Sequence, residues 1–214
     1  MLISRDDSSL VVDRLCDQVR GQSAIVTCLY FDFAARKEQS ATSMLGSLLK
    51  QMVGGMERIP EEISRALLDQ KQAISGRRPQ LADIMKMLQL ITSSRRTFMC
   101  IDALDECAGV QRVKLLDSLN RILEKSPGTR IFVTGRPHIR IEIEKRLPGR
   151  VVSVSVGPKR GDLIRYLRNR LNEDETPDAM DESLEVAILE KIPENLSEMC
   201  VEAMTSSTPP EIMG

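Results

Sequence analysis

The chain has 214 residues, of which 42% are hydrophobic and 29% are charged, and its formal net charge is −1. This composition is ordinary for a folded globular protein and argues against a disordered chain. Aromatic residues make up only 3% of the chain, so the core must consist mainly of leucine, isoleucine, valine and methionine. No apolar run approaches the roughly 18 residues that a membrane-spanning helix needs. No signal-peptide-like apolar segment opens the chain, so we expect a cytoplasmic protein without a membrane partner.

The cysteines and the histidine limit the chemistry that the chain can perform. The five cysteines are an odd number, are widely spaced and form no C-x-x-C pair. They are therefore interpreted as reduced, mostly buried thiols rather than as disulfides or a metal site. His138 is the single histidine and is interpreted as a turn residue rather than as a base. A zinc centre and a Ser-His-Asp triad are both disfavoured.

The first half of the chain predicts one strand among four helices. The segment "AIVTCLYFDF" is continuously apolar and rich in β-branched and aromatic residues, which is typical of a buried parallel strand. Apolar residues recur at helical spacing in the other segments, and glycine or proline separates several of them. The predicted helices span residues 8–20, 40–53, 60–74 and 80–94, and the strand spans 24–33.

The second half alternates strands with helices. Strands are predicted at 97–103, 129–137 and 150–156, and helices at 110–125, 139–147, 162–171 and 181–204, the last interrupted near Pro193. This alternation predicts an α/β fold in which helices cover both faces of a parallel sheet. Ligands of such sheets bind beyond the carboxyl ends of the strands.

Charge is distributed unevenly near the carboxyl end. Residues 130–170 contain eleven lysines and arginines against three acids, whereas residues 171–214 contain twelve acids and only Lys191 as a base. Such a pair of blocks is found in nucleic-acid-binding proteins, but also as two solvated faces that screen each other. The basic block has only Phe132 and Tyr166 as aromatic residues, so it lacks stacking platforms for single strands. The solvated-face interpretation is favoured over nucleic-acid binding.

Acidic residues follow the predicted strand at 97–103. Asp102 ends the apolar run, and Asp105 and Glu106 lie in the loop behind it. A carboxylate at a strand end can hold Mg²⁺ through water, and acids beside it can position a water near a terminal phosphate. The structural alternative is that Asp105 and Glu106 cap the helix starting near Val110. Arg136 ends the next strand and could bind phosphate, or it could be a surface residue before a turn.

Taken together, "CIDALDEC" and "RIFVTGRPH" resemble the NACHT family of signal-transduction NTPases, and fungal NLR-like incompatibility receptors in particular. The resemblance extends over about residues 8–199. It implies a Walker B segment in which Asp102 holds the metal while Asp105 and Glu106, as catalytic residues, orient the hydrolytic water. It also implies that Thr134 and Arg136 bind the nucleotide, with Arg136 sensing the γ-phosphate. The implied cofactor is ATP with Mg²⁺.

The chain departs from the family pattern in two places. Gly135 stands where the family usually has serine, which is expected to matter little. More importantly, a P-loop needs G-x-x-x-x-G-K-[ST], and none of the twelve glycines is followed by lysine. In the family that loop lies just before the helix at 8–20, so we expect it to fall at or before Met1. Without it, ATP binding is expected to be weak or absent, and catalysis by this chain is not expected.

The resemblance also implies a domain division and an open sheet edge. Residues 1–157 correspond to a partial nucleotide-binding domain, 158–204 to the start of a helical subdomain and 205–214 to a polar tail. The strand that leads into the P-loop would lie between those at 129–134 and 150–156, so its absence should expose an unpaired edge. Two hypotheses follow: a fragment of an ATP switch, or a non-enzymatic module that forms homo- or hetero-oligomers with full-length relatives through that edge.

Overall fold

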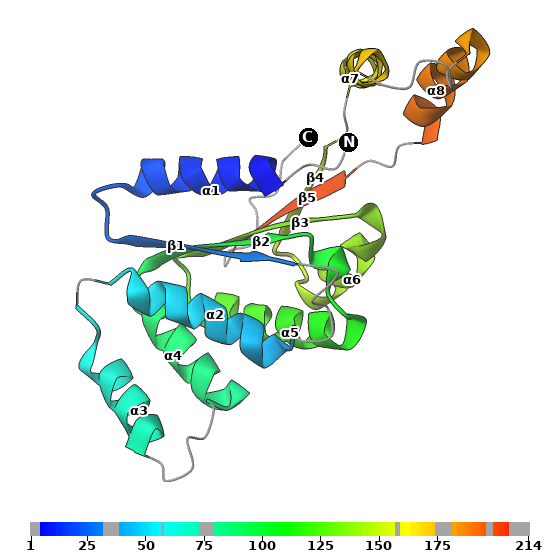
Figure 1. The fold of residues 1–214 in the computed structure, drawn as a ribbon. Coiled ribbons are helices and arrows are strands. Elements are labelled where there is room, and N and C mark those ends of the chain that lie inside the picture. The colour runs from blue at the N-terminus through cyan, green and yellow to red at the C-terminus, as the bar shows by residue number, and fades with distance from the viewer. Residues whose placement is uncertain are drawn as a thin grey trace, which may run out of the picture.

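A computed structural model describes residues 5–31, 39–56, 58–72, 79–156, 159–173, 181–195 and 199–205. Most helices and strands lie where the apolar patterns predict them (Figure 1). The elements are α1 (Arg5–Val19), β1 (Ala24–Tyr30), α2 (Ala41–Gly54), α3 (Glu61–Gln72), α4 (Leu81–Ser94), β2 (Arg96–Asp102), the 3-10 helix η1 (Leu104–Glu106), α5 (Gly109–Lys125), β3 (Thr129–Gly135), the 3-10 helix η2 (Pro137–Ile139), α6 (Arg140–Arg146), β4 (Val151–Val156), α7 (Arg160–Asn172), α8 (Glu182–Asn195) and β5 (Met199–Thr205).

The sheet has the strand order β1-β2-β3-β5-β4. Strands β1, β2 and β3 are parallel neighbours, and their register places Tyr30 opposite Asp102 and Ile101 opposite Val133. Because these strands run in the same direction, their carboxyl ends lie side by side at the same end of the sheet. The α/β fold expected from the sequence, with helices flanking a parallel sheet, is confirmed.

Helices cover both faces of the parallel part of the sheet. Helix α1 lies on one face, whereas α2, α4 and α5 lie on the other (Figure 1). Side chains therefore alternate along β1 between the α2 side, where Ile25 and Leu29 are buried, and the α1 side. Helix α2 begins at a serine cap, since the Ser40 side chain accepts the amide of Ser43 at 3.1 Å.

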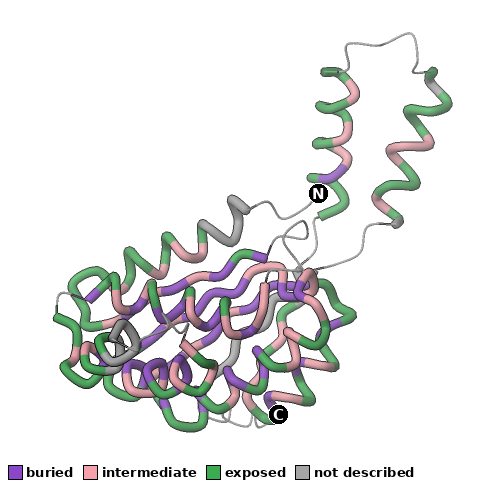
Figure 2. The backbone as a smooth tube through the Cα atoms, turned by 60° about the horizontal axis from the view of Figure 1, so that its bottom comes forward, coloured by how far each residue is buried: buried purple, intermediate pink, exposed green. Residues whose placement is uncertain are grey.

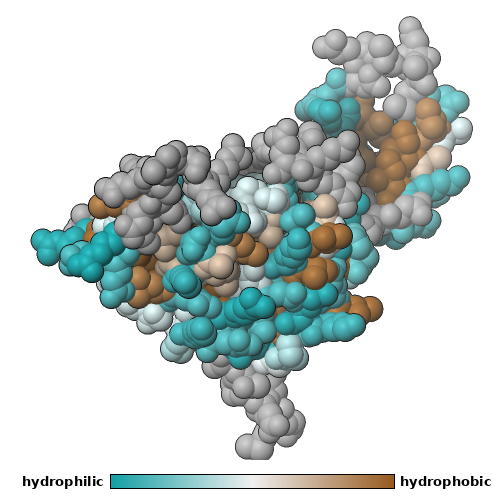
Figure 3. All heavy atoms as spheres, turned by 90° about the horizontal axis from the view of Figure 1, so that it is seen from below, coloured by the Kyte–Doolittle hydropathy of each residue, from teal (hydrophilic) through white to brown (hydrophobic). Residues whose placement is uncertain are grey.

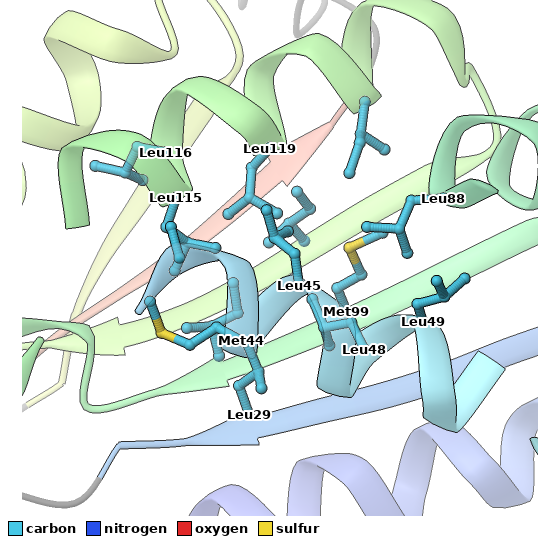
Figure 4. Packing of buried hydrophobic residues seen from close by; sticks show 14 of the residues in the cluster. Leu29, Met44, Leu45, Leu48, Leu49, Leu88, Met99, Leu115, Leu116 and Leu119 are labelled. Atoms are coloured by element: carbon cyan, nitrogen blue, oxygen red, sulfur yellow. The ribbon is translucent and has the colours of Figure 1, made fainter. Parts of the chain in front are cut away.

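The core lies between the sheet and the layer of α2, α4 and α5 (Figure 4). Aliphatic side chains fill it, as the scarcity of aromatic residues required. Leu45 and Leu48 of α2, Leu88 of α4, Leu119 of α5 and Met99 of β2 are all inaccessible to solvent. Truncation of any one of these to alanine would cost about 2–5 kcal/mol of unfolding free energy. This packed layer fixes the ends of β2 and β3.

The strand β3 has a hydrogen-bonded neighbour on the side where an unpaired edge was expected. Strand β5 lies between β3 and β4 and pairs antiparallel with both, so that Val133 and Ser153 face Glu202 from either side. The expectation of an unpaired edge on the strand at 129–134 is therefore wrong. The predicted helical segment over 181–204, interrupted near Pro193, is wrong for residues 199–204, because α8 ends at Asn195 and the chain returns to the sheet as β5. Residues 206–214 of the predicted tail lie outside the described residues.

Helices α7 and α8 form an arm that stands apart from the sheet (Figure 1). Most of the arm's residues are exposed or half-buried (Figure 2), and Leu163 is the one residue of its described part that is classed as buried. Hydrophobic side chains gather on this arm (Figure 3). The exposed ones include Tyr166, Leu184, Val186 and Ile192. The described helices include none with the length and apolar character that crossing a membrane requires.

Candidate functional site

A threonine hydroxyl joins the ends of β2 and β3. Thr134 Oγ1 donates a hydrogen bond to Asp102 Oδ1 at 2.5 Å and accepts one from the amide of Ala103 at 2.9 Å. The Thr134 side chain is buried. Its hydroxyl is therefore engaged in holding the Asp102 carboxylate, whereas the second carboxylate oxygen, Oδ2, has no hydrogen bond to the described residues.

The backbone turns sharply immediately after Asp102. Ala103 adopts the left-handed conformation, with φ 54° and ψ 45°, which costs a non-glycine residue about 1 kcal/mol or more. The turn places Leu104 in the core, where it is fully buried, while Asp102 remains half-buried at the sheet edge. Local strain is thus offset by the burial of Leu104 and by the hydrogen bond to Thr134.

Asp105 is directed toward the end of β3. Its Oδ1 accepts the amide of Arg136 at 3.2 Å, and its Oδ2 lies 3.5 Å from Arg136 Nε. The Asp105 side chain is 9% exposed, whereas that of Arg136 is 62% exposed. Gly135 permits this close approach, because a Cβ there would lie 3.4 Å from Asp105 Oδ1 and 2.6 Å from Ile139 Cδ1. Glycine therefore suits the packing at this position.

The helix-capping alternative for the acids is wrong. The residue that precedes α5 is Ala108, and no side chain caps this helix end. Asp105 instead bonds to Arg136, and the half-buried Glu106 carboxylate makes no hydrogen bond or ion pair within the described part of the chain. The five residues singled out from the sequence therefore gather at the carboxyl ends of β2 and β3. They form two linked pairs, Asp102–Thr134 and Asp105–Arg136, and Glu106 lies beside them.

Arg112 supports the acidic loop, and sequence reasoning missed it. From α5, its Nη1 donates to the carbonyl of Cys107 at 3.0 Å and to that of Asp105 at 3.4 Å. Its Nε and Nη2 both lie 2.8 Å from Glu142 Oε2 on α6. Both side chains are largely buried. An arginine in an amphipathic helix pattern resembles any surface charge, so nothing local in the sequence distinguishes it.

A shallow hollow lies beside Asp102, between α1 and the three parallel strands. It has no interior room for a water molecule, and no lysine or arginine of the described residues lines it. Burial, followed by the neighbouring Cys28, raises the pKa of Tyr30 to about 12, and Asp102 contributes to the rise. Burial also raises the pKa of Cys100 to about 12. The lining residues are Val12, Cys28, Leu29, Tyr30, Cys100, Ile101, Asp102, Phe132 and Thr134.

The donors at this edge suit a magnesium ion only in part. Mg²⁺ accepts one or two carboxylates when water and substrate phosphates complete its shell. Asp102 offers one carboxylate oxygen without a hydrogen-bond partner among the described residues, while its other oxygen is bound to Thr134. Within the described part of the chain no three acidic, histidine or cysteine side chains cluster closely enough to hold a metal. A magnesium ion would therefore depend on phosphate oxygens brought by a nucleotide.

Other sequence-based interpretations concern the thiols and the basic block. Among the described cysteines, Cys100 and Cys107 are buried, whereas Cys28 is half-buried and Cys16 is exposed. Several arginines of the basic block form surface ion pairs with acids. These pairs are Arg140–Glu144, Arg146–Asp117, Arg165–Asp162 and Arg170–Glu173. Such pairing is typical of a solvated face rather than of a phosphate-binding patch.

The part of the chain from α1 to the end of β3 matches a known protein family. Residues 8–136 match the family described as "Nephrocystin 3, N-terminal". This range extends from α1 to the end of β3 and includes all five site residues. Domains of this kind precede NACHT domains in NLR-like proteins, whereas the NACHT family itself is not matched. A search of curated proteins gives no match.

Proposed function

Because the chain belongs to the nephrocystin 3, N-terminal, family, which is linked to NACHT-type NLR-like proteins, we propose that it contributes the acidic and sensor side of a nucleotide switch. The observation that carries this proposal is the hydrogen bond between Thr134 and Asp102. That bond holds a carboxylate at the carboxyl edge of three parallel strands, where α/β sheets bind their ligands. The switch would act in signal transduction in the cytoplasm.

Each site residue has a distinct role in this proposal. Asp102 would hold Mg²⁺ through water, and the ion would neutralise charge on the β- and γ-phosphates. Thr134 orients Asp102 rather than touching the nucleotide, because its hydroxyl is buried and engaged. Arg136 is exposed enough to exchange Asp105 for a γ-phosphate oxygen. The Glu106 carboxylate has no partner among the described residues and would orient the hydrolytic water. Asp105 would hold Arg136 in position through their hydrogen bond and ion pair.

We also propose that the chain alone does not hydrolyse ATP. The sequence contains no G-x-x-x-x-G-K-[ST] segment, so no lysine and amide cradle is available for the phosphates. The hollow beside Asp102 supplies no cation. Carboxylates without balancing positive charge repel a triphosphate, so affinity would remain very low.

A titration with a fluorescent ATP analogue and Mg²⁺ tests this function. The 214-residue chain should bind more weakly than about 1 mM. A chain extended at its amino end by a G-x-x-x-x-G-K-[ST] loop and a strand that replaces β5 between β3 and β4 should gain affinity, and Asp102→Asn or Arg136→Ala should remove that gain. Ser93→Ala, on the surface of α4 away from the site, is a matched control. Micromolar affinity of the unextended chain, or ATP turnover abolished by Asp102→Asn, would contradict the proposal.

A second candidate is a non-enzymatic module that binds full-length NACHT relatives. The observation that favours it is the α7–α8 arm, which carries exposed apolar residues at Leu184, Val186 and Ile192. Large exposed apolar surfaces often mark protein–protein contacts. Co-purification with a full-length relative, lost on Leu184→Lys and Ile192→Lys, would support this candidate. Co-purification that persists in those variants would show that the α7–α8 arm does not make this contact.

A further inference from the structure

The two edges of the sheet differ in how they are protected. At the β1 edge, the side-chain amide of Gln51 imitates a neighbouring strand: Gln51 Oε1 accepts the amide of Cys28 at 2.9 Å, and Gln51 Nε2 donates to the carbonyl of Cys28 at 2.8 Å. At the other edge, β4 pairs with β5 on its inner side. No described residue pairs with its outer side. Unpaired edges of this kind are templates for the addition of another strand.

The β4 sequence lacks the features that usually prevent strand addition. Residues 151–156 read "VVSVSV", with no charge, no proline and no glycine. Monomeric proteins commonly place lysine, proline or a bulge in such strands. Val152 and Val154 point to the same face and are 46% and 54% exposed. The edge therefore offers both unpaired backbone groups and apolar surface to a neighbouring strand.

We propose that two copies of this chain pair through β4, antiparallel and about a two-fold axis at Ser153, into one continuous sheet. In this register Val152 of each copy lies opposite Val154 of the other, so the exposed valines cover each other. Ser153 lies opposite Ser153 of the second copy. Because a serine hydroxyl both donates and accepts hydrogen bonds, this central pair opposes no like charge and no bulky side chain.

The distribution of charge favours antiparallel over parallel pairing, and it favours a second copy of this chain as the partner of β4. The strand is uncharged, so self-pairing opposes no like charges within it. Arg150 of one copy would lie opposite Val156 of the other, whereas a parallel pairing would place Arg150 opposite Arg150. A two-fold interface uses the same surface on both copies and closes on itself, so it gives a dimer rather than a filament.

Sedimentation of the full chain over a range of concentrations provides the first test. The chain should form a concentration-dependent dimer. Val154→Lys should weaken dimerisation by about tenfold or more, because the two-fold axis introduces the charge twice. Val110→Lys replaces a valine that is 69% exposed on α5 and should leave the dimer unchanged. A monomer at all concentrations, open-ended aggregation, or a dimer insensitive to Val154→Lys would overturn the proposal.

Disulfide trapping tests the register independently of stability. In a Cys16→Ser background, which removes the thiol that is exposed among the described cysteines, Ser153→Cys should crosslink to itself under mild oxidation. Val152→Cys and Val154→Cys should crosslink efficiently only when the two variants are mixed. Circular dichroism establishes that each variant is folded. Self-crosslinking of Val152→Cys or Val154→Cys above that of the mixture would overturn the proposed axis.

Discussion

Thr134 is joined to Asp102 across the ends of two strands, with its hydroxyl donating to Asp102 Oδ1 while accepting the amide of Ala103. A single buried hydroxyl thereby satisfies a strained backbone amide and orients a carboxylate. The same arrangement explains why the left-handed conformation of Ala103 is maintained. The site geometry thus depends on one side chain from β3.

Replacement of Thr134 by valine should expose this dependence. Thr134→Val keeps the shape but leaves the Ala103 amide and one Asp102 oxygen without their partner, which should lower the unfolding free energy by about 1–3 kcal/mol. Thr134→Ser retains the hydroxyl and should lose less. Urea unfolding monitored by circular dichroism measures both, and equal losses for the two variants would show that the hydroxyl is not the cause.

Ala103 should tolerate glycine but not a β-branched residue. Glycine adopts a positive φ without steric cost, so Ala103→Gly should change the unfolding free energy by no more than about 1 kcal/mol, in either direction. Ala103→Val should destabilise by clearly more, because its branched side chain clashes with the left-handed backbone. Thermal melts of the two variants provide the comparison. A valine variant as stable as the glycine variant would mean that the backbone can leave this conformation freely.

The ion pair between Arg112 and Glu142 should show strong coupling. Arg112→Ala leaves a largely buried carboxylate and two loop carbonyls without a partner, so a loss of about 2–4 kcal/mol is expected. Lysine cannot form the forked contacts of arginine, and Arg112→Lys should recover only part of the loss. A double-mutant cycle with Glu142→Ala, measured by urea unfolding, isolates the pair. A coupling energy near zero would contradict this geometry.

Stability should fall at high pH because of Cys100. Burial raises the pKa of its thiol from 9.0 to about 12 in the folded chain. Between pH 9 and pH 12 the unfolded chain therefore loses this proton while the folded chain keeps it, so the unfolding free energy decreases as pH rises. The contribution is fully present below pH 9, and its slope is at most about 1.4 kcal/mol per pH unit.

The variants Cys100→Ala and Tyr30→Phe separate the two groups whose pKa is raised. Cys100→Ala should flatten the pH dependence from pH 9 upward, whereas Tyr30→Phe should flatten it only above pH 10, since the pKa of Tyr30 rises from 10.0 to about 12. Urea unfolding at intervals of half a pH unit provides the data. An unchanged slope in Cys100→Ala would show that the folded state ionises this thiol readily.

Gln51 should protect the β1 edge. Gln51→Met preserves the length and the apolar stem of the side chain but leaves the backbone amide and carbonyl of Cys28 unpaired. The unfolding free energy should therefore fall by about 1–3 kcal/mol. Hydrogen exchange at the Cys28 amide should accelerate in the variant, because its acceptor is removed. Gln18→Met, at an exposed position of α1, is a control for the general effect of this substitution. Equal exchange rates for Cys28 in wild type and Gln51→Met would contradict the capping role.

Local patterns in the sequence determined most of the helices and strands, and they determined that the site lies at the carboxyl ends of the parallel strands. Continuous apolar runs predicted the buried strands β1, β2 and β3, and helical spacing predicted the helices that cover them, because burial of apolar surface drives both. Two of these strands carry the site at their carboxyl ends: Asp102 ends β2 and Thr134 lies near the end of β3, while Asp105, Glu106 and Arg136 come just after them. Parallel strands bring such residues to one edge regardless of loop details.

Tertiary structure alone decided how these residues are paired and how the sheet ends. Nothing in the sequence around Asp105 indicates that it bonds to Arg136, or that Arg112 and Glu142 brace the loop, because those partners are about 30 residues away or lie on different elements. Residues 199–204 were predicted as helix from their apolar spacing, yet they belong to β5 (Met199–Thr205). Backbone groups of β3 and β4 would otherwise lack partners, and hydrogen bonding across the sheet outweighs local propensity there.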